Sequence, residues 1–189
     1  MAVIDYCPSV CPDCDDALPA LPSAAACEEI NTSLIDEIYI AKKGAAEFES
    51  WDEDTEWLTR LSQTDAGADK IRTFKAYKAT KPEVEPQFRT SQSGGKYAAP
   101  IGRTLEAYDD DASVEKHTWH KDMNGCDGGR QVRMWFKAGK YLYGGNTGII
   151  AVWSSYHGIV DSTDKPTEGW RIKLSWDAKC EPDKCLSPI

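Results

Sequence analysis

The stretch Trp170–Trp176 constrains the fold of this chain more than any other feature of its sequence. Four large apolar side chains alternate there with three polar ones. Successive side chains of a strand point to opposite faces, so this period of two predicts a half-buried β-strand. Gln131–Phe136 repeats the alternation, and Ile149–Tyr156 is a third, strongly apolar run. Together the three runs predict an antiparallel sheet of long strands.

A glycine-rich segment, Leu142–Gly148, leads into the third run. Gly144, Gly145 and Gly148 lie beside an asparagine, and these residue types adopt the positive φ that a tight connection or bulge requires. The segment is superficially similar to a phosphate-binding loop. It lacks the Lys-Ser/Thr end of such loops, however, and a strand rather than a helix is predicted after it. We therefore predict a turn and no phosphate site.

Further elements are indicated elsewhere along the chain. Strands are predicted at Ile35–Ile40, Ile71–Thr80 and Ile101–Tyr108. A short amphipathic helix or helical turn is predicted at Trp51–Ser62. The one good helix is predicted at Asp109–Asn124, where three aspartates favour the positive end of the helix dipole.

Both predicted helices carry capping signals. Ser50 and Glu53 fit a capping box, in which the serine hydroxyl accepts a hydrogen bond from the glutamate amide and the carboxylate reaches back. For the second helix, Asp111 or Ser113 can serve as the N-terminal cap, and Gly125 ends the helix. The sequence thus predicts where each helix begins as well as its presence.

The segments around these elements define the domain organisation. Residues 1–34 hold four prolines among small and acidic residues, which predicts an extended arm that either orders in a neighbour's groove or remains a free tail. Residues 35–180 make up the folded β-domain, and residues 181–189 a polar tail. Within the domain, Lys81–Pro100 predicts a projecting hairpin or a loop. The fold class is mainly β with one packed α-helix (α+β).

The net charge of -9 excludes some classes of function. Proteins that grip nucleic acid through its phosphates use clustered Lys and Arg. No run approaches the roughly 20 apolar residues that span a bilayer, and the first residues show no signal-peptide pattern. We therefore expect no membrane partner, no sequence-specific binding of DNA, and synthesis in a cytoplasm.

Four cysteines near the start of the chain are the candidate metal ligands. Cys7, Cys11, Cys14 and Cys27 have a spacing similar to that of a four-thiolate zinc site. The paired knuckles of common zinc sites are absent, so three states stay open. These are reduced thiols without a function, a zinc site, and disulfides, which require an oxidising compartment. No other cofactor is predicted.

Histidines and aspartates offer few other candidates for chemistry. His117 and His120 could ligate a metal together with Cys126, but no carboxylate follows at a familiar spacing, so a solvated pair on an exposed helix face is preferred. His157 is interpreted as a loop histidine beside a turn. Asp109–Asp111 lacks the EF-hand pattern and is interpreted as a charged helix start. Since no nucleophile motif is visible either, we predict no catalytic residue and no enzyme.

Strands, a projecting segment, a packed helix and three further strands follow one another from residue 35 to the end of the chain. The most telling segments are the helix after Asp109–Asp111, Val132–Phe136, Leu142–Ile149, Trp170–Trp176 and Cys185–Pro188. In this pattern the chain resembles the tail-tube (major tail protein) family of tailed bacteriophages. The arm rich in cysteine and proline departs from the simplest members of that family.

The resemblance implies a fold and a function. The fold would be an antiparallel β-sandwich or half-barrel with an extended N-terminal arm and a long hairpin. Such proteins are virion structural components that form rings, commonly hexameric, which stack into the tail tube. Copies would join edge to edge around an acidic lumen that DNA only passes through, and other virion proteins would be further partners. Met1–Ala26, Lys81–Pro100 and the C-terminal tail would fasten the rings of a tail assembled in the host cytoplasm.

Two other classes of function stay open. A capsid decoration, head-fibre or connector protein would equally suit a β-domain with an anchoring arm. A small ligand- or carbohydrate-binding β-domain would use surface aromatic side chains as its platform, and Trp135 and Trp153 are the candidates for it.

Overall fold

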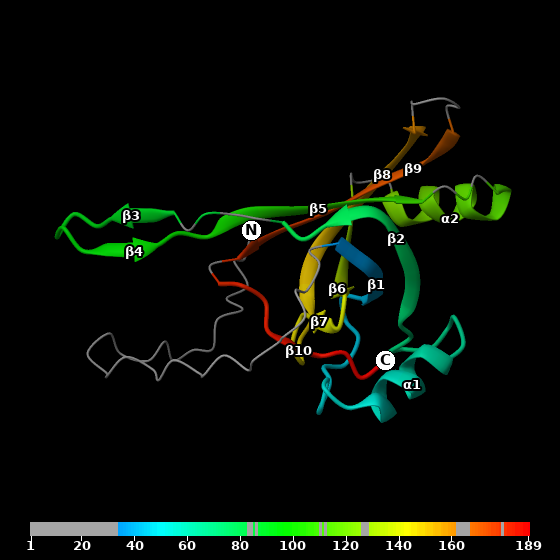
Figure 1. The fold of residues 1–189 in the computed structure, drawn as a ribbon, viewed down its shortest axis with the longest axis horizontal. Coiled ribbons are helices and arrows are strands. Elements are labelled where there is room, and N and C mark those ends of the chain that lie inside the picture. Colours follow the sequence, from blue (N-terminus) through cyan, green and yellow to red (C-terminus); the bar gives the residue numbers. More distant parts are fainter. Residues whose placement is uncertain are drawn as a thin grey trace, which may run out of the picture.

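The chain folds into a mainly antiparallel β-structure with two helices (Figure 1). The computed structural model describes residues 34–82, 85, 87–109, 111, 113–125, 129–161, 167–178 and 180–189. The confirmed class is α+β and mostly β. Its elements are β1 (Leu34–Lys42), α1 (Asp54–Ser62), β2 (Arg72–Thr80), β3 (Phe88–Thr90), β4 (Lys96–Ala98), β5 (Ile101–Asp109), α2 (Val114–Asn124), β6 (Arg130–Ala138), β7 (Tyr141–Tyr143), β8 (Ile149–Asp161), β9 (Thr167–Ala178) and β10 (Lys184–Leu186).

Six of the strands close into a barrel. Their order is β1-β2-β5-β9-β8-β6, and β6 pairs again with β1, for example Met134 with Ile40. Every neighbouring pair in this cycle is antiparallel. A closed sheet removes open edges within a single chain. Along most of the cycle, the strand edges that were expected to be completed by identical copies are therefore paired within the chain.

The barrel interior is filled by the inward side chains of all six strands. The alternation predicted for β9 is confirmed, since Trp170, Ile172, Leu174 and Trp176 are buried while the residues between them are partly exposed. β6 departs from it, because both of its faces are buried from Val132 onward. Its second face is covered by α1, a layer that a strand's own periodicity cannot reveal.

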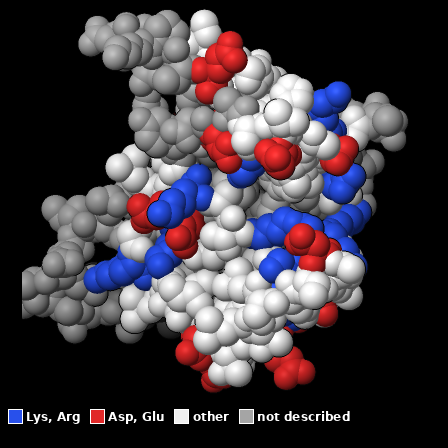
Figure 2. All heavy atoms as spheres, turned by 90° about the vertical axis from the view of Figure 1, so that its right-hand side faces the viewer, with Lys and Arg blue, Asp and Glu red and all other residues white. Residues whose placement is uncertain are grey.

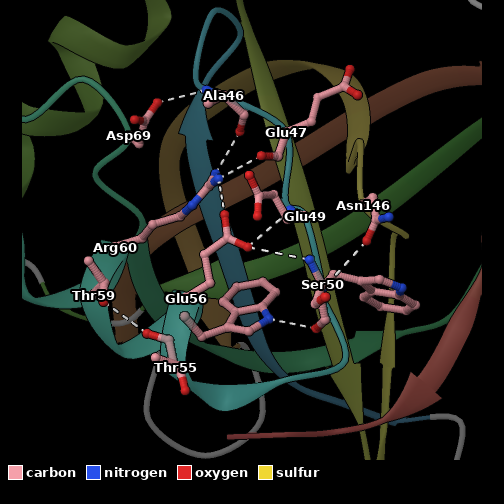
Figure 3. Close-up of polar contacts among 12 residues, drawn as sticks. Ala46, Glu47, Glu49, Ser50, Thr55, Glu56, Thr59, Arg60, Asp69 and Asn146 are labelled. Carbon is pink, nitrogen blue, oxygen red and sulfur yellow. Dashed lines mark hydrogen bonds and ion pairs between the residues drawn. The ribbon is translucent and has the colours of Figure 1, made fainter.

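α1 covers one outer side of the barrel over a second apolar cluster. Trp57 of the helix contacts Trp135 of β6 edge to face, with ring centroids 5.4 Å apart, and stacks on Phe48 at 4.4 Å. The buried guanidinium of Arg60 donates to the carbonyl oxygens of Ala46 at 2.6 Å and Glu47 at 2.7 Å (Figure 3). The helix therefore fastens the β1–α1 connection to the barrel.

The capping box predicted for α1 is wrong. The helix begins at Asp54, Glu53 occupies the capping position, and no side chain caps it. Glu56, in the first turn, instead accepts a hydrogen bond from the backbone amide of Glu49 at 3.0 Å (Figure 3). Glu56 also pairs with Arg60, one turn later in the same helix.

α2 agrees with its predicted caps but starts later than predicted. Ser113 is the cap, its hydroxyl accepting from the Lys116 amide at 3.3 Å, and Gly125 ends the helix with φ of 61°. Asp109 is the last residue of β5 and not part of the helix. The described part of the chain has these two helices, at the two places where the sequence indicated helical structure, and neither is long and apolar enough to cross a membrane.

The projecting hairpin predicted within Lys81–Pro100 is confirmed. β3 and β4 form a two-stranded sheet of their own, and Figure 1 shows it extending away from the barrel at the end opposite to α2. Residues 181–189, set apart as a tail, contribute β10, which pairs with β7, for example Cys185 with Leu142. The C-terminal segment is thus an edge of the main sheet.

The turn predicted at Leu142–Gly148 is confirmed, with φ of 141° at Gly144, 72° at Gly145 and 64° at Gly148. The indole of Trp135 fills the space beside these glycines. A Cβ atom on Gly148 would lie 2.7 Å from the Trp135 ring. The Trp135 indole also donates to the Gly145 carbonyl at 2.8 Å. The glycine loop therefore packs over the buried side chain of Trp135.

Candidate functional site

His120 is the most completely enclosed polar side chain of the candidates. It is 0% exposed and stacks on Trp170, with ring centroids 4.4 Å apart and ring planes 13° apart. Its Nδ1 lies 3.2 Å from Ser155 Oγ, and its Nε2 lies 3.4 Å from Asp109 Oδ2. The predicted solvated pair is therefore wrong for His120, because α2 turns this residue onto the barrel.

Asp109 is the acidic partner in this cluster. Burial of its carboxyl disfavours ionisation, but hydrogen bonds from His120, from Lys116 and from the Asp111 amide outweigh burial and hold the pKa of Asp109 well below its usual range. Lys116 Nζ lies 2.9 Å from Asp109 Oδ2. The first of the three aspartates therefore joins β5 to α2 as a carboxylate that stays ionised at neutral pH.

The order Ser155, His120, Asp109 invites comparison with a hydrolase triad. The Ser155 hydroxyl already donates to Asn124 Oδ1 at 3.1 Å, and the Ser155 amide donates to the same oxygen at 2.7 Å. Ser155 is buried, and neither it nor His120 lines either of the grooves described below. A nucleophile must reach its substrate, so the geometry describes a fastening network between α2 and β8.

The other two histidines lie on the rim of the same cluster. His117 and His157 both meet the Trp170 ring edge to face at 5.2 Å, and their own ring centroids are 5.8 Å apart. His157 lies within β8 and not beside a turn, which corrects that prediction. Among the residues that the structure describes, no three histidines, cysteines or acidic residues come together as metal ligands. Cys126, the third candidate ligand, lies outside those residues.

The two tryptophans considered as a surface platform are both interior residues. Trp135 and Trp153 are 0% exposed. Trp135 lies between α1 and the glycine loop, and Trp153 packs in the barrel against Phe74 and Trp119. A carbohydrate cannot stack on either ring, so this form of the ligand-binding hypothesis is wrong.

The cysteines divide between described and undescribed parts of the chain. Cys7, Cys11, Cys14 and Cys27 lie outside the described residues, so the three states proposed for them stay open. Cys180 is disulfide-bonded. Cys185 is free, and burial, followed by the nearby charge of Asp52, raises the pKa of its thiol to about 11. Its thiolate is therefore scarce at neutral pH.

Two open grooves lie beside β2, on the side where α2 begins. The larger, of about 730 Å³, lies between β1, β2, the end of β5 and Lys116. The smaller, of about 370 Å³, continues toward α1 and is lined in part by Leu61, Phe74 and Trp119. On the face shown in Figure 2, positive and negative side chains are intermixed rather than separated into one acidic field. The larger groove is lined in part by Asp109 and Lys116, and Asp109 is the acidic partner of His120.

Sequence reasoning missed both the grooves and the Asp109–His120 contact. The contact joins a strand end to a helix, and hydrogen bonding of this kind carries no sequence period. The larger groove exists because β2 continues past the end of β5, which depends on the register of the two strands. The only available signal was the cluster of aspartates before the helix.

Comparison with known proteins provides no relative for this chain. No family, no curated protein and no solved structure matches it.

Proposed function

We propose that this chain is a structural subunit that assembles with copies of itself into stacked rings of a bacteriophage tail tube, through which DNA passes. The observation that carries the proposal is the β3–β4 hairpin. All three side chains of β3 are exposed, and Phe88 is 66% exposed. An isolated two-stranded hairpin is at best marginally stable in water. A hairpin that projects from a barrel with an exposed aromatic side chain gains most from a partner that covers it.

The closed barrel changes how the subunits would join. Ring formation by continuing one sheet from copy to copy requires open edges, and most edges of the six barrel strands are already paired within the chain. Among the described residues, contacts through the hairpin, the β10 edge and the stretch of β2 beyond the end of β5 are left. Exchange of such parts between rigid bodies is a common route to closed assemblies.

The charges also suit a channel for DNA. Residues 1–33 contain six acidic residues and no Lys or Arg, so the remaining chain carries 25 acidic against 22 basic residues. On the outer face of β5 and β9, Lys173 pairs with Glu106 at 2.9 Å, and Arg171 donates to the Tyr156 hydroxyl at 2.9 Å. Cations engaged in this way leave no dense basic patch on that face to hold phosphates.

The proposal is tested by the size and shape of the purified full chain. Light scattering at rising concentration, followed by negative-stain microscopy, should reveal rings or tubes of uniform bore. A variant in which Phe88–Ala98 is replaced by a short Gly-Ser linker should keep the far-ultraviolet circular dichroism of the barrel and lose assembly. A chain that stays monomeric at high concentration overturns the proposal. A small oligomer without a bore that binds capsids would identify a decoration protein instead.

A further inference from the structure

Among the residues that the structure describes, one stretch of β2 has no strand partner on the side that faces β5. Tyr77 of β2 is the register partner of Tyr108 in β5, which places Ala76 opposite Asp109, the last residue of β5. The residues of β2 before Ala76 therefore extend beyond the end of β5. An exposed strand edge carries backbone donors and acceptors ready to pair with another strand.

The larger groove follows this edge. On its other side β2 is paired with β1, through Thr73 with Tyr39 and Phe74 with Ile38, so only the groove side is open. Thr73, Phe74 and Ala76 line the groove of about 730 Å³ together with Tyr108. The site thus combines an open edge, an apolar floor and room for an added strand, which are the elements of peptide recognition by β-augmentation.

The β3–β4 hairpin has the complementary features. Its two strands pair only with each other in their sheet, so each has an outer edge to offer, and each is three residues long, which fits within the four-residue open segment of β2, residues 72–75. Gln87–Ala98 carries two positive residues and no acidic one. The groove is lined by Asp36, Glu37 and Asp109 against Lys75 and Lys116, so a small excess of negative charge faces the positive hairpin.

The hairpin of the same chain cannot fill this groove. Figure 1 shows the hairpin at one end of the longest axis, and α2, beside the groove, at the other. Two complementary surfaces at opposite ends of one molecule make a head-to-tail contact, which generates rings when the rotation closes and filaments when it does not. The occupant must therefore come from a second copy.

We propose that the groove between β2 and α2 receives the β3–β4 hairpin of another copy of this chain, which adds a strand to the open edge of β2. This inference rests on the proposed function, because it names the contact through which the subunits assemble. Phe88 covers the apolar floor at Phe74, and the positive hairpin faces the acidic side of β1. The contact uses one surface from each end of the subunit.

Site-specific photo-cross-linking of the full chain tests this contact. With benzoylphenylalanine in place of Phe88, irradiation of the assembled protein should yield cross-links to residues 73–76 or Tyr108, located by mass spectrometry. Mixing of isotopically labelled and unlabelled copies should show that they join different chains. The same probe in place of Leu58, which is exposed on α1, should not label these residues. Cross-links from position 88 to α1, β10 or another face overturn the inference.

A substitution in the groove provides the second arm. Thr73→Arg should lower the yield of this cross-link by about ten-fold or more, because an arginine obstructs the edge and repels the positive hairpin. Thr104→Arg, at an exposed position of β5, should leave it unchanged. An unchanged yield in Thr73→Arg also overturns the inference. If rings form with the hairpin seated elsewhere, only this contact is wrong, whereas a monomeric wild-type chain contradicts the proposed function itself.

Discussion

The imidazole of His120 lies parallel to the indole of Trp170, with 4.4 Å between ring centroids. The same imidazole reaches Asp109 at the end of β5 and Ser155 on β8 with its two nitrogens. One side chain of α2 therefore contacts three consecutive strands of the barrel cycle. The position of the helix, and with it one wall of the larger groove, depends on this residue.

Replacing this imidazole should loosen α2. We expect His120→Ala to lower the free energy of unfolding by about 2–4 kcal/mol, because it leaves a cavity against Trp170 and removes two polar contacts. His117→Ala, on the exposed side of the same helix, should stay within about 0.5 kcal/mol of wild type. Urea titrations followed by circular dichroism measure both free energies of unfolding. Equal losses of stability in the two variants would contradict this role of His120.

Acid should weaken the contribution of Asp109. Its pKa is lowered in the folded chain, so the unfolded chain binds this proton more readily. The contribution is therefore fully present above pH about 4 and declines as the pH falls below it. Asp109→Asn should destabilise the protein at pH 7, and by a smaller amount at pH 3. Asp122→Asn, an exposed position on α2, serves as the control, and a destabilisation by Asp109→Asn that is the same at both pH values would argue against this linkage.

The glycine loop should tolerate no side chain at Gly148. The position has φ of 64°, and a Cβ atom there would lie 2.7 Å from the Trp135 ring. We expect Gly148→Ala to cost about 1–3 kcal/mol of stability from strain and contact together. Gly44→Ala, where nothing lies within 4 Å of the added atom, should be nearly neutral. Thermal unfolding distinguishes the two variants. Similar melting temperatures would show that the loop backbone shifts to accommodate the added atom.

The buried guanidinium of Arg60 should matter far more than an exposed one. Arg60→Met leaves the carbonyl oxygens of Ala46 and Glu47 without this donor, which costs about 2–4 kcal/mol. Arg72→Met breaks an exposed pair with Asp65 and should cost less than about 1 kcal/mol. Chemical denaturation compares them. An Arg60→Met protein as stable as wild type would show that the β1–α1 connection does not depend on these two hydrogen bonds.

The local sequence patterns predicted the strands well where only one face of the strand is buried. The strands at Ile35–Ile40, Ile71–Thr80 and Trp170–Trp176, the glycine turn and the projecting hairpin are all present. The capping box at Ser50 failed, because the helix begins later, at Asp54, with Glu53 in the capping position. A cap is a local interaction worth about 1 kcal/mol, which contacts made elsewhere in the fold can outweigh.

The candidate site was less accessible to sequence reasoning. The two histidines of α2 were interpreted as a solvated pair on an exposed helix face. His117 is exposed, whereas His120 is buried, because its burial depends on how α2 rotates onto the barrel. Trp135 and Trp153 are apolar residues on predicted strands, and whether such rings are core or surface is decided by what covers the strand. No periodicity in the chain shows the second layer made by α1.

The sequence by itself determined the strand periodicity, the turn glycines, the end of α2 and the excess of acidic residues at the start of the chain. These depend on backbone geometry and composition over a few residues. Only the tertiary structure decided that β6 returns to β1 and closes the barrel, and that α1 packs on the second face of β6. It also decided that β2 extends past the end of β5, which leaves a short stretch of its edge without a strand partner among the described residues. Register and closure join residues far apart in the chain, and their energies depend on contacts that no local pattern contains.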